Sequence, residues 1–405
     1  MGPMAERRFD IVLFGATGFT GGLTAEYLAR NVPAQARWAL AGRNRAKLEA
    51  VRERLAAINP SCADLELLTA DVSQPETLKS VAESTRVVIT TVGPYLAYGE
   101  PLVAACAAAG TDYVDLTGEP EFVDKMYLRY HQKAKESGAR LVHACGFDSI
   151  PYDLGVYFTV KQLPSDQPIH VDGFIRAGGR PSGGTLASAL GAMGRLRQAQ
   201  AVAKARRRAE EKPRDRSVRP VAGKPHRSSV AQAWVLPMPT IDPQIVTRSA
   251  AALDEYGPRF TYSHYAAMKR LPTAVGTVAG VAVVGTLAQV PQIRKLLGNL
   301  QKPGEGPDPQ TRAKGWFTAR FHGTSAGRSV ITEVSSDGDP GYDETAKMLS
   351  ESAMCLAFDE LPSTAGQVTT AVAMGDALIE RLRKAGISFT MLEKPPTYPP
   401  SRPRR

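Results

Sequence analysis

A short apolar strand followed by a glycine-rich turn, residues 9–22 (FDIVLFGATGFTGG), constrains the fold of this chain more than any other stretch. Residues 10–14 are largely apolar and β-prone, which predicts a buried strand. Gly15, Gly18 and Gly21 then lead into a run that is compatible with a helix, LTAEYLARN. With a strand, a turn and a helix in this order, the free N–H groups at the start of the helix can receive a phosphate.

Each of the three glycines is favoured at its position for a different physical reason. Gly15 lets the backbone reverse tightly at the end of the strand. Gly18 has no Cβ, so a pyrophosphate can approach the main chain, and Gly21 lets the helix lie close to the strand. The spacing is G-x-x-G-x-x-G and not the commoner G-x-G-x-x-G, and the alternative is an ordinary glycine-rich turn. The strand before the turn and the helix after it favour dinucleotide binding.

The residues after the second predicted strand, 37–42, indicate which dinucleotide is bound. An NAD-binding fold usually places Asp or Glu there to bind the ribose 2′-hydroxyl, whereas this chain has Arg43 and Asn44. A guanidinium pairs well with a phosphate, so the sequence favours NADPH over NADH, and the alternative for Arg43 is a solvated loop arginine. Asp71 ends the third predicted strand, where it either lies near the adenine or caps the next helix.

The first 150 residues keep an alternation of strand and helix. Further strands are predicted at 65–70, 86–92, 113–116 and 140–144. This rhythm predicts an α/β fold with an N-terminal Rossmann domain, a doubly wound parallel sheet, over residues 1–150. Ligands of such sheets bind at the carboxyl ends of the strands. The candidate cofactor contacts are therefore Gly15, Thr17, Gly18, Phe19, Thr20, Gly21, Arg43, Asn44, Asp71, Thr91, Val92, Gly93 and Pro94.

A second domain is expected over residues 151–340, because the pattern there changes to alternating strands with short connections. The strands are predicted at 170–176, 245–251, 259–266, 316–324 and 329–335, the last two as a hairpin. This arrangement predicts an inserted α+β domain with a mixed or antiparallel sheet for substrate or partner binding. The composition of 213–229 is loop-like. Residues 341–395 show two helical patterns, 343–359 and 369–385, and a last strand, 387–392; the tail 396–405 is expected to be disordered.

The positive charge of the chain is concentrated in one part of the second domain. The net charge is +10, and residues 195–227 hold twelve Lys or Arg against three Asp or Glu. This basic segment, 195–228, carries nearly all of the excess, so we do not expect a nucleic-acid-binding protein. The four scattered cysteines are expected to be reduced thiols of a cytoplasmic protein, and no metal-type spacing of Cys or His is present.

The segment 271–293 has no charged residue and reaches the ~20 residues that a bilayer-spanning helix needs. We do not expect a span, because two prolines and three glycines weaken it and because a span would separate strands of one sheet. We favour a helical hairpin or lid that touches a membrane; a buried helix or a homodimer interface is the alternative. With the basic segment, it predicts peripheral, salt-sensitive binding to the anionic inner face of the plasma membrane.

No motif in the sequence identifies the proton donor of a redox reaction, because the cofactor carries most of the chemistry. Tyr95 and Tyr98 follow the fourth strand, where nicotinamide and substrate would meet. Asp148 and Tyr152 lie at the expected domain junction. These four residues are the candidate catalytic groups. The alternative for each is structural: a tyrosine in the wall between domains, or an aspartate that caps a helix.

Several blocks of the sequence together resemble the saccharopine-dehydrogenase-like family, and in particular its trans-acting enoyl reductases. They are GATGFTG, AGRNRAKL, TTVGPYLAYGEPLVAACAAAGTDYVDLTGE, CGFDSIPYDLGV, KPGEGP and GDPGYDETAKMLSESAMCLA. The resemblance extends along nearly the whole chain, and GFDSIPYDLG is more specific than the glycine loop. It implies a Rossmann domain, an inserted α/β domain and C-terminal helices that return to the first domain.

The resemblance also implies an activity: NADPH-dependent reduction of an enoyl chain, in trans, on a polyketide or lipid product of the phthiocerol and phenolic glycolipid type. The substrate would be a lipid or polyketide, carried or not by a domain of the synthase. No cluster of residues is assignable to the carboxylates of an amino-acid substrate, which argues against saccharopine chemistry. Two alternatives stay open: an oxidoreductase of an amino-acid adduct, and a non-catalytic NADP-binding protein at a lipid surface.

Overall fold

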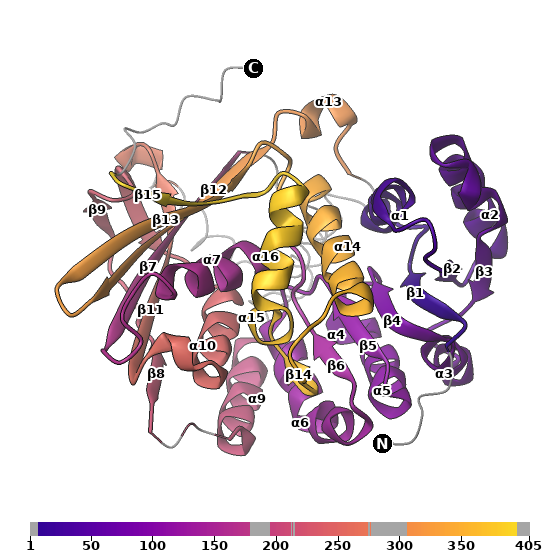
Figure 1. Cartoon of the computed structure of the whole chain (residues 1–405), viewed down its shortest axis with the longest axis horizontal. Coiled ribbons are helices and arrows are strands. Elements are labelled where there is room, and N and C mark those ends of the chain that lie inside the picture. Colours follow the sequence, from indigo (N-terminus) through magenta and orange to yellow (C-terminus); the bar gives the residue numbers. More distant parts are fainter. Residues whose placement is uncertain are drawn as a thin grey trace.

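Two β-sheets stand side by side in the computed structural model, with helices between them (Figure 1). The structure describes residues 7–178, 195–211, 213, 215–273, 276 and 306–394. In Figure 1 the first sheet is on the right and the second on the left. The expected class, a parallel Rossmann sheet joined to a mixed sheet, is confirmed.

The first sheet has seven parallel strands in the order β14-β6-β5-β4-β1-β2-β3. They are β1 (Phe9–Phe14), β2 (Trp38–Gly42), β3 (Glu66–Thr69), β4 (Thr85–Thr90), β5 (Asp112–Asp115), β6 (Arg140–Val142) and β14 (Gly366–Val368). The strand order reverses between β1 and β4. In an open α/β sheet, this reversal places the ligand crevice at the carboxyl ends of those two strands.

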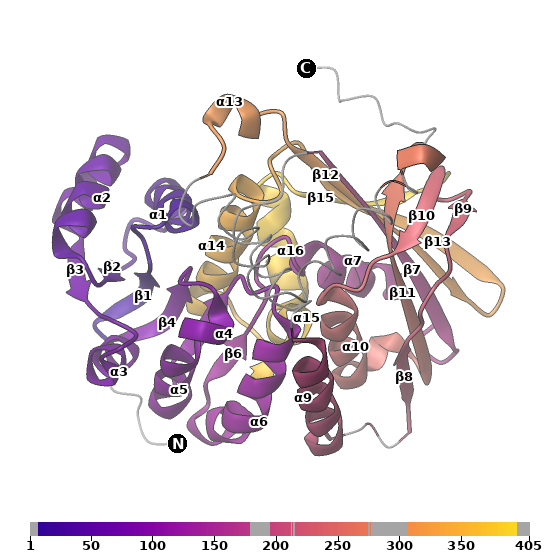
Figure 2. The ribbon, with the colours of Figure 1, turned by 180° about the vertical axis from the view of Figure 1, so that it is seen from behind.

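Helices cover both faces of the first sheet. One face carries α1 (Phe19–Asn31), α2 (Arg45–Ile58) and α14 (Asp343–Phe358); the other carries α3 (Pro75–Ser84), α5 (Glu100–Ala109) and α6 (Pro120–Ser137), seen from behind in Figure 2. Along β1, Ile11 and Leu13 join the first of these cores, and Val12 and Phe14 join the second. Burial on both faces explains why this strand is an apolar run without alternation.

The second sheet has eight strands, with the path β15-β13-β12-β7-β11-β10-β9 and with β8 beside β11. They are β7 (Ile169–Gly178), β8 (Ser217–Pro220), β9 (His226–Ser228), β10 (Ala233–Pro237), β11 (Arg259–Met268), β12 (Trp316–Ser325), β13 (Arg328–Ser336) and β15 (Ser388–Leu392). β11 runs parallel to β7 and β8, and the other pairs are antiparallel. The predicted hairpin is confirmed as β12 and β13.

The two sheets share one apolar core through α7 (Ile150–Val160), which is buried almost throughout. The remaining elements are short or peripheral: α4 (Tyr95–Tyr98), α9 (Leu196–Ala209), α10 (Asp242–Ala252), α13 (Pro309–Arg312), α15 (Thr370–Ala373), α16 (Gly375–Lys384), η1 (Pro60–Asp64) and η2 (Asp254–Tyr256). Figure 1 shows α14 and α16 in the middle of the molecule, between the two sheets.

The strand predicted at 245–251 is wrong, because these residues lie in helix α10. Pro243 stands in the first turn, and the buried residues Ile245, Val246, Ser249 and Ala250 recur at helical spacing. The reading of 213–229 as a loop is also wrong in part, since β8 and β9 lie there. Their side chains are mostly exposed, so no apolar alternation marks them.

No helix among the described residues is long and apolar enough to cross a bilayer. The apolar segment predicted at 271–293 lies outside the described residues, apart from 271–273 and 276, as does the tail 396–405. The contact of segment 271–293 with a membrane and the disorder of the tail therefore both stay predictions.

Candidate functional site

The glycine turn between β1 and α1 has the geometry that its residues predict. Gly15 has φ of +99°, a left-handed conformation that favours glycine. A Cβ on Gly15 would lie 2.8 Å from Thr91 Oγ1, and a Cβ on Gly21 would lie 2.1 Å from the carbonyl oxygen of Gly15. Neither position has room for a side chain. The two glycines therefore allow the start of α1 to pack closely against the ends of β1 and β4.

The start of α1 is open and fits the pyrophosphate of a dinucleotide. Gly18 is the N-cap residue, and no side chain caps the helix. Within the described part of the chain, the N–H groups of Phe19, Thr20 and Gly21 have no hydrogen-bond acceptor. A Cβ on Gly18 would meet only the Gly15 carbonyl oxygen, at an ordinary 3.5 Å. Unpaired N–H groups with the positive end of the helix dipole form an anion site.

The side chain of Phe19, a candidate cofactor contact, is turned toward the C-terminal part of the chain. Its ring meets Tyr342 edge-on, with centroids 4.9 Å apart, and the guanidinium of Arg312 lies 5.5 Å from its centroid. A Cβ on Gly306 would lie 2.2 Å from the same ring. The ring therefore anchors the first turn of α1, and only its backbone N–H is left for a phosphate.

The residues predicted to select the 2′-phosphate lie at the carboxyl ends of β2 and β3. Arg43 is exposed, and no described residue forms a hydrogen bond or ion pair with it. Asn44 caps α2 by accepting a hydrogen bond from the N–H of Lys47 at 2.9 Å. Asp71 accepts hydrogen bonds from Ser73, which lower its pKa, and the charge of Arg43 lowers it further. Arg43 is thus near Asp71 and available for a phosphate.

Replacing Arg43 by alanine is expected to remove the preference for NADPH. A lost charge-assisted contact of about 1.5–3 kcal/mol corresponds to an NADPH affinity that is about 10- to 100-fold weaker. The affinity for NADH should hardly change. Titration of both cofactors against Arg43→Ala measures this, with Lys47→Ala, an exposed cation one turn into α2, as the matched control. Equal affinity of the unmodified protein for NADH and NADPH would refute the assignment.

The loop after β4 closes the centre of the crevice. Thr91 donates a hydrogen bond from Oγ1 to the Gly15 carbonyl oxygen at 3.1 Å, and its N–H donates to Phe14. Val92 is half-buried, whereas Gly93 and Pro94 are exposed at the same edge. This loop is therefore tied to the glycine turn, and its open part faces the place where the sequence puts the nicotinamide.

The two tyrosines of α4 have opposite environments. Tyr95 is buried in the core of the first sheet; its hydroxyl donates to the Thr90 carbonyl oxygen at 3.0 Å and accepts from the N–H of Leu116 at 3.4 Å. Burial raises the pKa of Tyr95 well above its usual value. This placement favours the structural alternative for Tyr95. Tyr98 is 46% exposed, and its catalytic role stays a prediction.

The other two candidates lie in a polar cluster between the sheets. Tyr152, on α7, is 1% exposed, and its hydroxyl has no hydrogen-bond partner in the described residues. Asp242, the first residue of α10, lies close enough for its charge to raise the pKa of both Asp148 and Tyr152. His264 of β11 meets the Tyr152 ring edge-on, with centroids 4.9 Å apart, and its Nε2 is 3.4 Å from Asp242 Oδ2. We name Asp148, Tyr152, Asp242 and His264 the junction cluster.

Sequence reasoning missed Asp242 and His264. Asp242 precedes the stretch 245–251 that was predicted to be a strand, and its position at the start of α10 places it in the junction. His264 is a lone histidine on a strand, which has no local motif. An Asp-Pro pair at a helix start was the one available signal for Asp242.

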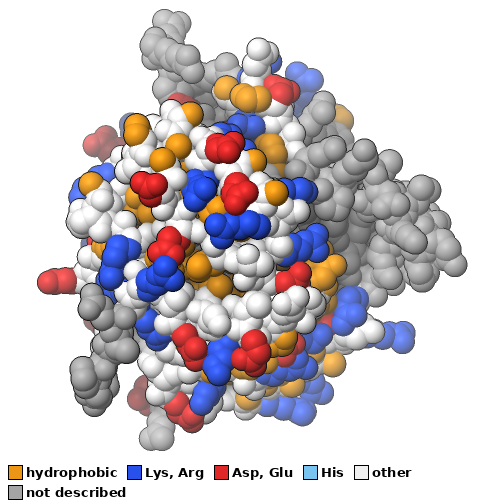
Figure 3. Space-filling model, turned by 90° about the vertical axis from the view of Figure 1, so that its right-hand side faces the viewer, with side chains coloured by type: hydrophobic (Ala, Val, Ile, Leu, Met, Phe, Trp, Pro, Cys, Tyr) orange, Lys and Arg blue, Asp and Glu red, His pale blue; other side chains and the backbone are white. Residues whose placement is uncertain are grey.

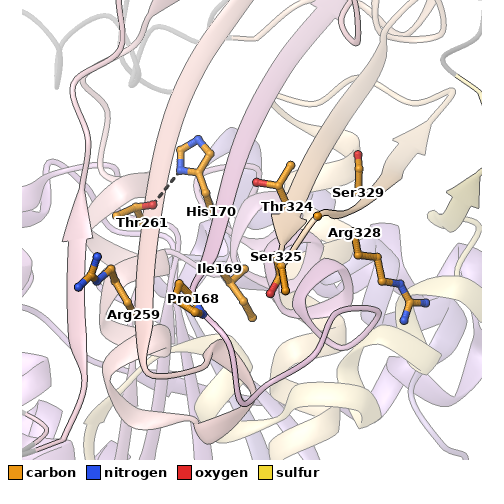
Figure 4. Close-up of a pocket in the computed structure, with 11 residues that line it drawn as sticks. Pro168, Ile169, His170, Arg259, Thr261, Thr324, Ser325, Arg328 and Ser329 are labelled. Carbon is orange, nitrogen blue, oxygen red and sulfur yellow. Dashed lines mark hydrogen bonds between the residues drawn. The ribbon is translucent and has the colours of Figure 1, made fainter.

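A surface pocket in the described residues lies elsewhere, on the second sheet (Figure 4). Its volume is about 360 Å³, and it lies between the starts of β7 and β11 and the β12–β13 turn. Arg259 and Arg328 point away from each other in Figure 4, and His170 is hydrogen-bonded to Thr261. The arginines do not converge on one point, so this pocket offers no anion site and does not belong to the crevice.

Comparison with known proteins shows an NADP-binding domain in the N-terminal part of the chain. Residues 11–142 match the family described as the saccharopine dehydrogenase NADP-binding domain. A trans-acting enoyl reductase of Mycobacterium tuberculosis is 40% identical over 414 residues, and one of Mycobacterium ulcerans is 37% identical over 417 residues. Each alignment covers 95% of this chain and 97% of the relative.

A solved structure shows the same fold at low sequence identity. Saccharopine dehydrogenase (L-Glu forming) from Saccharomyces cerevisiae superposes with a TM-score of 0.56 at 10% identity, covering 95% of this chain and 100% of that one. The match supports the two-sheet architecture alone. With the NADP-binding match and the full-length relatives, the chain belongs to the saccharopine-dehydrogenase-like family of NADP-dependent oxidoreductases that includes the trans-acting enoyl reductases.

Proposed function

We propose that this protein is an enoyl reductase that uses NADPH to reduce a polyketide or long-chain lipid intermediate in trans, within lipid or glycolipid biosynthesis. The observation that carries the proposal is the full-length similarity to proteins named trans-acting enoyl reductases, together with the open phosphate site at the start of α1. The cofactor supplies a hydride when bound. The chain's own residues hold the pyrophosphate on α1 and the 2′-phosphate on Arg43.

The charges at the junction disfavour an amino-acid adduct as substrate. The described groups there are Asp148, Asp242, Tyr152, Tyr262 and His264, and burial lowers the pKa of His264 to about 3, so that it is neutral. Carboxylates of a saccharopine-like substrate would need Arg or Lys partners, and these described groups supply none. An uncharged acyl chain has no such conflict.

Cofactor oxidation with matched substrates tests the proposal. We expect NADPH oxidation with an enoyl thioester, faster when a long acyl chain is presented on a carrier domain, and no oxidation with a keto acid plus an amine. Oxidation with the keto acid and amine alone would favour the amino-acid reaction. A protein that binds NADPH and oxidises it with neither substrate would be the non-catalytic alternative.

Membrane contact is the second part of the proposal, and the structure reduces the charge available for it. In the basic segment, Arg195 pairs with Glu121 at 2.7 Å, and Arg206 pairs with Asp124 at 2.6 Å. Both acids belong to α6, beside which α9 lies in Figures 1 and 2. The exposed cations of α9 are Arg197, Lys204, Arg207 and Arg208. Residues 197, 204 and 208 share one face at helical spacing.

We predict that the exposed cations of α9 bring the protein to anionic liposomes at low salt. Each cation near such a surface contributes about 1 kcal/mol. The triple variant Arg197→Gln, Lys204→Gln, Arg208→Gln should float at least about 10-fold less, because the positive charge of that face is removed. Lys79→Gln, Lys314→Gln, Lys384→Gln removes the same charge from other exposed positions and is the control. Equal flotation of the two variants would contradict binding through α9.

The side of the molecule formed by the first sheet and its helices has a mixed surface in the described residues. Figure 3 looks at the side that is on the right in Figure 1, and acidic and basic side chains are interspersed over most of it. Hydrophobic side chains appear there in small groups between polar ones. A mixed surface of this kind is typical of a solvent-exposed face, so the visible part of this side does not suggest a membrane contact.

A further inference from the structure

The two aspartates of the junction cluster differ in their access to the crevice. Asp148 follows β6 at the carboxyl edge of the first sheet and is half-buried, whereas Asp242 is fully buried. Asp148 Oδ2 lies 3.3 Å from the position that a Cβ on Gly118 would take. Gly118 is itself exposed, a few residues after β5. The carboxyl of Asp148 therefore lies beside Gly118, near the carboxyl edge of the first sheet, where ligands of such sheets bind.

Buried polar atoms of the cluster lack partners. The Tyr152 hydroxyl, Asp242 Oδ1 and His264 Nε2 make no hydrogen bond in the described structure, although these residues are 1%, 0% and 5% exposed. Buried polar groups are nearly always hydrogen-bonded in proteins. Three orphaned atoms in one cluster next to the crevice indicate a place where a bound molecule completes the hydrogen bonding.

We propose that Asp148 is the general acid of the reduction and that the neighbouring carboxyl of Asp242 holds the proton on it. The proposal rests on the enoyl reductase function proposed above. No described Lys or Arg forms an ion pair with either aspartate, and the one cationic type nearby, His264, is buried. Among the four residues of the junction cluster, Asp148 is the half-buried one, and it lies beside the exposed Gly118.

The step balances in atoms and electrons. Hydride addition to the β-carbon of the conjugated double bond moves the π electron pair toward the α-carbon and the carbonyl oxygen. The O–H bond of Asp148 then breaks, its proton forms the new C–H bond at the α-carbon, and Asp148 is left as a carboxylate. Water at the exposed edge beside Gly118 returns the proton. The product is the saturated chain, and the cofactor leaves oxidised.

Burial and a neighbouring carboxyl favour the protonated form of Asp148. Burial and the negative charge of Asp242 raise the pKa of Asp148, and burial raises the pKa of Asp242. Two carboxyls this close cannot both ionise readily. The groups that face them are Tyr152 and Asp153 of α7, and Tyr262 and His264 of β11. None of these carries a positive charge at neutral pH that would stabilise a second carboxylate.

Turnover measurements with Asp148→Asn test the assignment. At saturating NADPH and enoyl thioester we expect kcat to fall by about 10²-fold or more, with unchanged NADPH affinity, because general acids contribute about 10²–10⁴. Asp148→Glu should recover part of the rate. Asp242→Asn removes a like charge, so the fall of the rate at high pH should move to lower pH by about 1–2 units. Asp166→Asn, an exposed loop position, is the control.

Infrared spectroscopy, which needs no turnover, tests the protonation of Asp148 independently of the proposed enoyl reductase function. We expect the infrared difference between unmodified protein and Asp148→Asn at neutral pH to show the C=O stretch of a protonated carboxyl, and Asp242→Asn to weaken it. If the unmodified protein shows this band but reduces no enoyl thioester, the proposed function is refuted, whereas the protonated state of Asp148 is supported. Undiminished kcat in a folded Asp148→Asn, or a carboxylate difference band in place of the acid band, would overturn the role of Asp148.

Discussion

A protein with Gly18 replaced by valine is expected to fold normally and to bind NADPH at least about 100-fold more weakly. The backbone of Gly18 is extended, with φ of −79° and ψ of 168°, a conformation that valine adopts readily. The new Cβ meets only the Gly15 carbonyl oxygen, at 3.5 Å. The side chain would instead occupy the space above the free N–H groups of α1, where the pyrophosphate must lie.

The neighbouring glycine provides the contrast for this experiment. Gly21→Ala would place its Cβ 2.1 Å from the Gly15 carbonyl oxygen, so we expect it to lower the stability of the protein itself. Cofactor titration and thermal unfolding of both variants separate the two effects. A folded Gly18→Val that binds NADPH as tightly as the unmodified protein would show that the pyrophosphate site is not on α1.

The second large effect is expected at Asp153, which connects three helices. Asp153 is fully buried on α7; its carboxylate accepts from Ser249 Oγ of α10, from Thr370 Oγ1 at 2.6 Å and from the N–H of Ala371 at 2.8 Å. Asp153→Ala leaves these donors buried and without their acceptor. We expect the free energy of unfolding to fall by about 3–5 kcal/mol, the cost of breaking a buried polar network.

Urea unfolding measures this change, and α16 offers a matched control. Asp376 carries an exposed carboxylate that pairs with Lys161, so Asp376→Ala should cost under about 1 kcal/mol. A loss at Asp153 no larger than the loss at Asp376 would mean that the junction of α7, α10 and α15 is not held by this carboxylate.

The phosphate site was predictable from sequence because it is local. Gly15, Gly18 and Gly21 act through the backbone of one turn, and Arg43 through its place at the end of one strand, so spacing alone located them. The same reasoning could not separate Tyr95 from Tyr98. Both lie on the four residues of α4, and only the three-dimensional structure shows that the first enters the core and the second leaves it.

The junction cluster was predictable only in part, because its members come from distant segments. Asp148 and Tyr152 are local to the block GFDSIPYDLG, whereas Asp242 and His264 are brought there by α10 and β11. The strand β14, which joins the first sheet from the C-terminal part, was missed because its three residues are too few to show a period. Long-range packing, and not local preference, decides such positions.

Transfer of deuterium from the cofactor to the substrate tests the central claim most directly. NADPH labelled at the transferring carbon of its nicotinamide ring is incubated with the protein and a carrier-bound enoyl thioester, and the product is analysed by mass spectrometry. The account predicts one deuterium at the β-carbon of the saturated chain and one solvent hydrogen at the α-carbon. A chain recovered unreduced, or reduced without cofactor-derived deuterium at the β-carbon, would contradict it.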